Sequence, residues 1–154
     1  MRVLAILFIV FAFAQPYTGN LGDSNTGNNR LISMYIDNSN SMSAKGSNGE
    51  LLSLAKTNAK EIIQQFPANQ KFIVVSNELN GIQQRTLSQN EALYEIDQIN
   101  YTPIQRNINT ILNWQHEISQ KELNVNHNLK NFSYILLSDF QRDFFKLDNI
   151  KKDL

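Results

Sequence analysis

Three short apolar runs alternate with segments of helical periodicity, and this alternation limits the chain to folds that combine strands with helices. The runs cover residues 31–36, 71–76 and 132–138, and each has the length and residue types of a buried strand. Between the first two runs, apolar side chains recur at helical spacing from Leu51 to Phe66, and Pro67 ends the pattern. The sequence therefore predicts an α/β domain.

Local signals add further elements. Residues 81–86 predict a polar edge strand, because their Gln and Arg side chains suit exposure. Ser88 and Glu91 form a capping box that opens a short helix. A longer helix follows Pro103 and is marked by Ile108, Ile111, Leu112, Gln115 and Ile118. The expected order, β-α-β-β-α-α-β, favours a Rossmann-like, mostly parallel sheet with helices on both faces.

The composition excludes several classes of protein. With 154 residues, 42% of them hydrophobic, the chain has the size and apolar content of one globular domain. Its 14 basic and 14 acidic side chains cancel, so we expect no nucleic-acid partner. The chain has no cysteine, which excludes disulfides and thiolate chemistry, and it carries no hydrolase elbow or nucleotide-binding loop. We therefore do not expect an enzyme.

The first 17 residues form a separate apolar segment. Arg2 precedes an uninterrupted apolar run that ends at Ala14, shorter than the roughly 20 residues that span a bilayer. A signal peptide cleaved before Gln15 and the outer part of a membrane anchor are both open interpretations. Residues 18–30, rich in Gly and Asn, predict a flexible linker, so the folded domain is expected at 31–154.

Acidic residues end two of the apolar runs. The first run leads directly into Asp37-x-Ser39-x-Ser41, and the last ends at Asp139. The carboxyl ends of parallel strands meet at one edge of a sheet, where ligands bind. Carboxylate and hydroxyl oxygens are the ligands that Mg²⁺ prefers, so the sequence predicts a magnesium site at this edge.

Simpler interpretations of the same residues stay open. The Asp-x-Ser-x-Ser stretch could be a turn whose side chains only satisfy backbone N–H groups. Asp139 could cap a helix that begins at Phe140. His116 and His127 are expected at the surface or on a helix rather than as ligands, since no second carboxylate pattern surrounds them.

With these residues the chain resembles the von Willebrand factor A family. The metal-ion-dependent adhesion site of that family uses Asp-x-Ser-x-Ser after the first strand and an Asp after the fourth. The resemblance implies that Ser39 and Ser41 contact Mg²⁺ directly, while Asp37 and Asp139 act largely through water. A carboxylate of a partner protein would complete the octahedron, and Mn²⁺ or Ca²⁺ could replace Mg²⁺.

The chain departs from the family at the fifth ligand, which is a Thr in a later loop. Residues 101–107 fill that region, and Arg106 stands where the Thr belongs. Its guanidinium would repel an ion, or would close the site by pairing with Asp37 or Asp139. Thr102 is the substitute ligand if the loop is rearranged.

A narrower resemblance concerns residues 4–7, 12–17 and 138–141, which look like the aerotolerance (Bat-type) membrane proteins of Bacteroidetes-like bacteria. It implies that residues 1–17 are most of the second of two membrane helices, and that the domain faces the periplasm from the inner membrane. It also implies a truncated copy, whose von Willebrand-type domain is partial after Asp139. Cleavage of residues 1–17 would instead give a secreted protein.

The expected function follows from both resemblances. It is a membrane-tethered module that binds a protein partner in a membrane complex through a complete or degenerate Mg²⁺ adhesion site. The alternative is a metal-free structural scaffold domain of a bacterial envelope complex, in which Arg106 closes the site.

Overall fold

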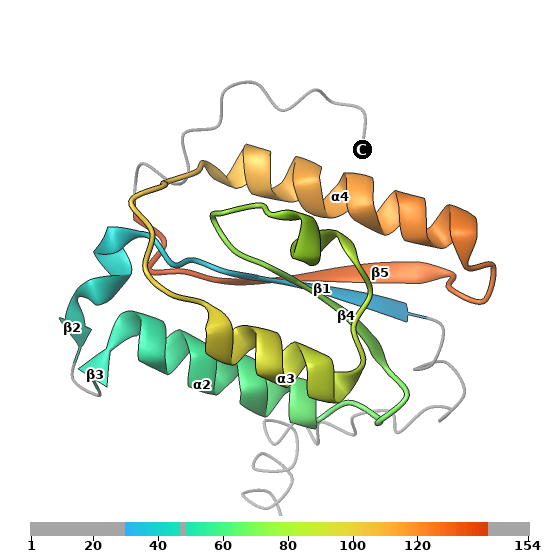
Figure 1. The fold of residues 1–154 in the computed structure, drawn as a ribbon, viewed down its shortest axis with the longest axis horizontal. Helices are drawn as coiled ribbons and strands as arrows, with labels where there is room; N and C mark the ends of the chain where they lie inside the picture. Colours follow the sequence, from blue (N-terminus) through green and yellow to red (C-terminus); the bar gives the residue numbers. More distant parts are fainter. Residues whose placement is uncertain (1–29, 47–48, 142–154) are drawn as a thin grey trace, which may run out of the picture.

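A computed structural model describes residues 30–46 and 49–141, and they form an α/β fold around a parallel sheet. The sheet has three strands in the order β4 (Lys71–Val75), β1 (Arg30–Ile36) and β5 (Asn131–Leu137). Both neighbouring pairs are parallel. The predicted class and the three apolar strands are therefore confirmed, and the carboxyl ends of all three strands lie at one edge, the left edge in Figure 1.

Strand β1 lies in the middle of the sheet and is buried on both faces. Six of its seven residues are buried, as expected for a continuous apolar run in a parallel sheet. Alternate side chains face opposite sides, so Met34 joins one apolar cluster and Tyr35 the other. The strand pairs Tyr35 with Val75 of β4 and Ile36 with Leu137 of β5.

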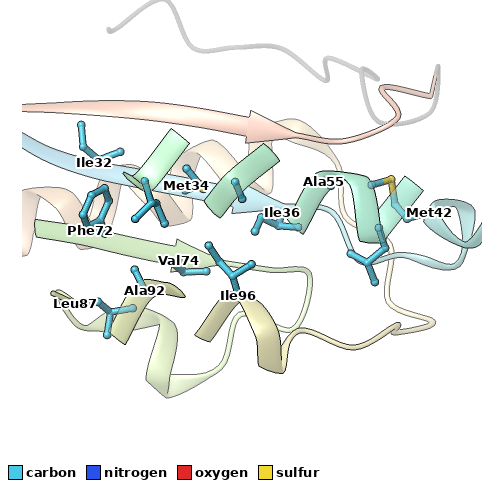
Figure 2. Close-up of a cluster of buried hydrophobic side chains, with 13 residues drawn as sticks. Ile32, Met34, Ile36, Met42, Ala55, Phe72, Val74, Leu87, Ala92 and Ile96 are labelled. Atoms are coloured by element: carbon cyan, nitrogen blue, oxygen red, sulfur yellow. The ribbon is translucent and has the colours of Figure 1, made fainter. Parts of the chain in front are cut away.

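Helices cover both faces of the sheet (Figure 1). Helices α2 (Leu51–Gln64) and α3 (Gln89–Gln98) pack on one face, and α4 (Ile108–Val125) packs on the other. The α2/α3 side encloses the larger cluster of buried residues, shown in Figure 2: Ile32, Met34, Ile36, Met42, Leu52, Ala55, Ala59, Ile63, Phe72, Val74, Leu87, Ala92 and Ile96. The α4 side encloses Leu31, Tyr35, Ile73, Val75, Ile111, Ile118 and Leu129.

The helix boundaries agree with the local signals. Helix α2 ends three residues before Pro67, and its buried positions repeat at helical spacing. Helix α3 begins at the predicted capping box, in which the Ser88 hydroxyl accepts from the Glu91 N–H and the Glu91 carboxylate accepts from the Ser88 N–H. Helix α4 is capped by the Asn107 side chain, which accepts from the Thr110 N–H.

The predicted edge strand at 81–86 is wrong. Gly81–Gln84 is a 3-10 helix, η3, and the nearest strand-like contact is an antiparallel bridge between Phe72 and Leu87. The backbone N–H of Leu87 donates to the Phe72 carbonyl at 2.7 Å, and the Leu87 carbonyl accepts from the Phe72 N–H at 3.0 Å. The side chain of Leu87 is 1% exposed, so an apolar residue takes the pairing position beside β4 and the preceding polar residues form a turn.

A second difference lies in the loop after β1, where no strand was expected. Residues Asn40–Ser43 form a 3-10 turn, η2, and the two-residue strands β2 (Lys45–Gly46) and β3 (Gly49–Glu50) pair antiparallel before α2 begins. Gly49 has φ 115°, a backbone conformation that is strongly disfavoured for residues other than glycine.

The predicted membrane or signal segment, residues 1–17, lies outside the described residues. Within the described ranges, no helix has both the length and the apolar character that crossing a membrane requires.

Candidate metal centre

Asp37 leaves β1 at the carboxyl edge of the sheet and is held there by its neighbour strand. Its backbone N–H donates to the carbonyl of Leu137, the last residue of β5, at 2.8 Å. Asp37 is 5% exposed, so its carboxylate is almost completely buried at the end of the apolar strand.

The Asp37 carboxylate accepts three hydrogen bonds from other groups of the chain. Oδ1 accepts from the backbone N–H of Ser39 at 2.9 Å and from the Asn77 side-chain amide at 2.8 Å. Oδ2 accepts from the Ser138 hydroxyl at 2.8 Å. Because both oxygens are engaged, the carboxylate has one fixed orientation, and its remaining lone pairs are available to water or a cation.

Ser39 and Ser41 present their hydroxyl oxygens side by side. The two hydroxyls hydrogen-bond to each other with their Oγ atoms 3.0 Å apart, and the 3-10 turn that starts at Asn40 produces this approach. Adjacent ligands of octahedral Mg²⁺, each about 2.1 Å from the ion, are themselves about 3 Å apart. The hydroxyl pair therefore has the spacing of two neighbouring positions in such a shell.

Asp139 lies beside Asp37 through a shared neighbour. The hydroxyl of Ser138 is 2.8 Å from Oδ2 of Asp37 and 3.4 Å from Oδ1 of Asp139. The structure thus brings together the two strand-end carboxylates that the sequence predicted. No helix begins at Phe140, which has φ 51° and is followed by the irregular residue Gln141, so Asp139 does not cap a helix there.

Thr102 lies next to the Asp37 turn. Its backbone N–H donates to the Asn38 carbonyl at 2.9 Å, and Thr102 forms a parallel bridge with Ser39. Thr102 is 5% exposed, and its hydroxyl accepts from the Ile104 N–H at 3.3 Å. The loop before α4 therefore brings a hydroxyl-bearing residue beside the turn that follows β1.

Arg106 binds a backbone carbonyl instead of a carboxylate. Its Nε donates to the carbonyl oxygen of Asn77 at 2.6 Å. Within the described part of the chain, the ion pairs are Lys60 with Asp97 and Arg85 with Glu95, and neither involves Arg106. The expected closing salt bridge from Arg106 to Asp37 or Asp139 is thus not formed, and the guanidinium holds the loop after β4.

Two buried asparagines that were not predicted from the sequence, Asn77 and Asn38, complete the site. Asn77 accepts from the Tyr35 hydroxyl at 2.8 Å, and its backbone N–H donates to the Asn38 side chain at 3.0 Å. The Asn38 amide in turn donates to the Asn100 carbonyl at 2.6 Å. Asn77 stands two residues after β4, so the strand-end rule that selected Asp37 could also have found it.

The burial and the charge of the site change the pKa of the Tyr35 hydroxyl. Burial, and then the negative charge of Asp37, raise the pKa of Tyr35 far above its ordinary value. Tyr35 therefore stays protonated and serves as a fixed donor to Asn77 at any physiological pH.

The donor set fits a hard cation better than a soft one. It comprises two carboxylates and neighbouring hydroxyls. Among the described residues, no three or more His, Cys, Asp or Glu side chains form a group that could hold a metal. Mg²⁺ is commonly held by one or two carboxylates with water completing its shell, so the chemistry of this set is compatible with it. The imidazole of His116 is engaged elsewhere, 3.3 Å from the Tyr134 hydroxyl.

No protein-family model, no curated protein and no solved structure matches the chain.

Proposed function

We propose that this chain is a von Willebrand factor A-like module that binds a partner protein through a Mg²⁺ adhesion site. In this proposal residues 1–17 tether it to the bacterial inner membrane, and the domain faces the periplasm. The observation that carries the proposal is the 3.0 Å pair of Ser39 and Ser41 hydroxyls beside the fixed carboxylate of Asp37.

The fold supports the finer assignment. The parallel order β4-β1-β5 places the first strand in the middle, and helices cover both faces as in Rossmann-like sheets. The turn after β1, the end of β5 and the loop carrying Thr102 meet at one edge. These three segments, far apart in sequence, carry the Asp, Ser and Thr residues of the proposed site.

The residues of the site would divide the work between direct and indirect contacts. Ser39 and Ser41 would offer neutral oxygens, while Asp37 and Asp139 would orient water from behind. A Mg²⁺ held mainly by neutral ligands would keep enough positive charge to bind a carboxylate of the partner. Asn77 and Ser138 would act one step further out, by holding the Asp37 carboxylate in its orientation.

The test is a calorimetric titration of the full chain with Mg²⁺ and Mn²⁺, beside Ser39→Ala and Asp37→Ala. We expect saturable binding to the wild-type chain and a loss of about tenfold or more in affinity in either variant. Ser53→Ala, an exposed hydroxyl on α2, is the matched control and should bind like the wild type.

Circular dichroism of each variant separates loss of the site from loss of the fold. Equal affinity of wild type, Ser39→Ala and Asp37→Ala would contradict the site, as would a folded wild-type chain that binds neither ion.

A metal-free scaffold is the second candidate, and one observation favours it. The Asp37 carboxylate has three donors from the chain itself, and Arg106 holds the adjoining loop through the Asn77 carbonyl, so protein groups alone supply hydrogen-bond partners at this edge. A bound ion adds stability in proportion to the logarithm of its concentration over its dissociation constant. A melting temperature and partner capture that do not change under excess chelator would favour the scaffold.

A further inference from the structure

Arg106 brings a positive charge to the edge of the sheet where Asp37 lies. Its Nε donates to the Asn77 carbonyl at 2.6 Å, and the side-chain amide of the same Asn77 donates to Asp37 at 2.8 Å. A single residue thus links the guanidinium to the Asp37 carboxylate. Burial, and then the charge of Asp37, raise the pKa of the Tyr35 hydroxyl, and the charge of Arg106 acts on the same hydroxyl in the opposite direction. The two charges therefore belong to one electrostatic neighbourhood.

The guanidinium of Arg106 keeps most of its capacity for hydrogen bonds. It has five N–H donors, and the bond from Nε to the Asn77 carbonyl uses one of them. Among residues 30–46 and 49–141, its two terminal nitrogens bond to no other group, and the ion pairs are formed by Lys60 and Arg85 instead. Because the Asn77 contact restricts the orientation of the group, these nitrogens form a fork of the kind that binds a carboxylate through both oxygens.

The carboxylates of the site itself do not occupy this fork. Both oxygens of Asp37 have other donors, and Oδ1 of Asp139 lies 3.4 Å from the Ser138 hydroxyl. Glu78, the residue after Asn77, is exposed, and its carboxylate accepts from the Asn80 amide at 3.4 Å. The fork thus has no partner among these acidic side chains.

Charge complementarity indicates what the fork binds, and this step rests on the proposed function. The two negative charges of Asp37 and Asp139 would balance the two positive charges of Mg²⁺. Counted over these groups, Arg106 leaves the edge with one positive charge in excess. One carboxylate neutralises that charge and has the two coplanar oxygens that a guanidinium fork matches.

We propose that the terminal nitrogens of Arg106 bind the carboxylate of the partner's Asp or Glu side chain. Arg106 is then the residue that makes the site specific for acidic partners. It stands where the family resemblance expects a Thr, and in this role it contacts the partner instead of closing the site. A partner in which an amide replaces that carboxylate loses the charge and one of the two acceptors, and so binds weakly.

Acetate, a carboxylate without a side chain, tests this assignment on the full chain in neutral detergent with saturating Mg²⁺. Relaxation of ¹³C-labelled acetate measures its binding, and labelled acetamide is the uncharged control probe. We expect Arg106→Gln to weaken acetate binding about tenfold or more, because a charge-assisted pair of hydrogen bonds is lost. Arg85→Gln, at an exposed arginine that pairs with Glu95, is the matched control and should bind acetate like the wild type.

The wild-type chain gives a second readout that does not depend on how a variant folds. The Nε–H resonance of Arg106, identified by its loss in Arg106→Gln, should shift saturably as acetate is added and should not shift with acetamide. Circular dichroism confirms that the variants are folded. An Arg106 resonance that does not respond to acetate, or equal acetate affinities of wild type and folded Arg106→Gln, would overturn the proposal.

Calorimetry with Mg²⁺ on the same chains separates this inference from the proposed function. Arg106→Gln should bind the ion at least as tightly as the wild type, because the substitution removes a neighbouring positive charge. If both chains bind Mg²⁺ and acetate equally, the role of Arg106 is wrong and the proposed metal site stands. A wild-type chain that binds no Mg²⁺ would contradict the proposed function, and this inference with it.

Discussion

At the scale of single residues, the Asp37 carboxylate shows how a charge is kept at the end of a buried strand. Burial of an unpaired carboxylate is costly, so its oxygens need donors that cannot move away. Ser39, Asn77 and Ser138 provide them from three segments, and the Tyr35 hydroxyl holds Asn77 in turn. Hydrogen bonds between protein groups therefore hold the polar site together.

The Asn77 side chain should accordingly contribute to stability. Asn77→Ala removes one donor from Asp37 and the acceptor of the Tyr35 hydroxyl, and we expect the free energy of unfolding to fall by about 1–3 kcal/mol. Urea denaturation measures this change. Asn80→Ala, an exposed amide in the same loop, should stay within about 0.5 kcal/mol of wild type. A loss no greater than that of the control would show that the buried amide is not needed.

At the scale of elements, polar contacts join α4 to the sheet and α3 to α2, in addition to the apolar faces of these helices. Gln115 of α4 is fully buried, and its side-chain amide donates to both the carbonyl and the hydroxyl of Ser33 in β1. Gln89 of α3 donates to the carbonyls of Ile63 and Phe66, and so closes the end of α2. These contacts fix where α4 lies along the sheet and where α3 lies against α2, which apolar packing alone specifies less sharply.

The start of α3 depends on its capping box. Ser88→Ala removes the hydroxyl that accepts from the Glu91 N–H, and should cost about 1 kcal/mol in the free energy of unfolding at pH 7. Urea denaturation should show this loss, whereas Ser53→Ala, at an exposed position of α2, should show none. A Ser88→Ala chain as stable as wild type would mean that α3 does not need its cap.

The same box makes part of the stability depend on pH. The Ser88 N–H, and then the Ser88 hydroxyl, lower the pKa of Glu91 from its ordinary value of 4.5. A carboxyl group whose pKa is lowered by folding stabilises the fold at pH values above its ordinary pKa. This stabilisation is lost as the pH falls through the pKa of the folded state. The difference between wild type and Ser88→Ala should therefore shrink below pH 4.5.

At the scale of the whole molecule, one sheet separates two apolar layers. Strand β1 contributes alternate side chains to both layers, so Met34 packs under α2 and α3 while Tyr35 packs under α4. Because the strand cannot leave one layer without leaving the other, the two should unfold together.

A core substitution on one face of the sheet should thus change the unfolding midpoint of the layer on the other face. Ile63→Ala, in the α2/α3 layer, should lower the free energy of unfolding by about 2–5 kcal/mol. Trp114, the single tryptophan, lies against the α4 layer and reports its unfolding by fluorescence. The fluorescence and circular dichroism midpoints of Ile63→Ala should move together in urea. A fluorescence transition that stays at the wild-type midpoint would show that the layers unfold separately.

Local sequence determined the elements and the strand-end residues. The strands β1, β4 and β5 and the helices α2, α3 and α4 could be predicted, because burial and backbone hydrogen bonding repeat with a period inside each element. So could the placement of Asp37 directly after β1 and of Asp139 two residues after the end of β5. The edge strand expected at 81–86 failed because polarity alone does not distinguish an exposed strand from a turn.

Only the tertiary structure decided which groups meet. Asp37 finds Asn77 40 residues away and Ser138 101 residues away, and both contacts depend on the order and register of the parallel strands. Thr102 lies beside Ser39, and Arg106 meets the Asn77 carbonyl rather than a carboxylate, for the same reason. Side-chain periodicity records which face of an element is buried, but it carries no information about which distant residue lies across that face.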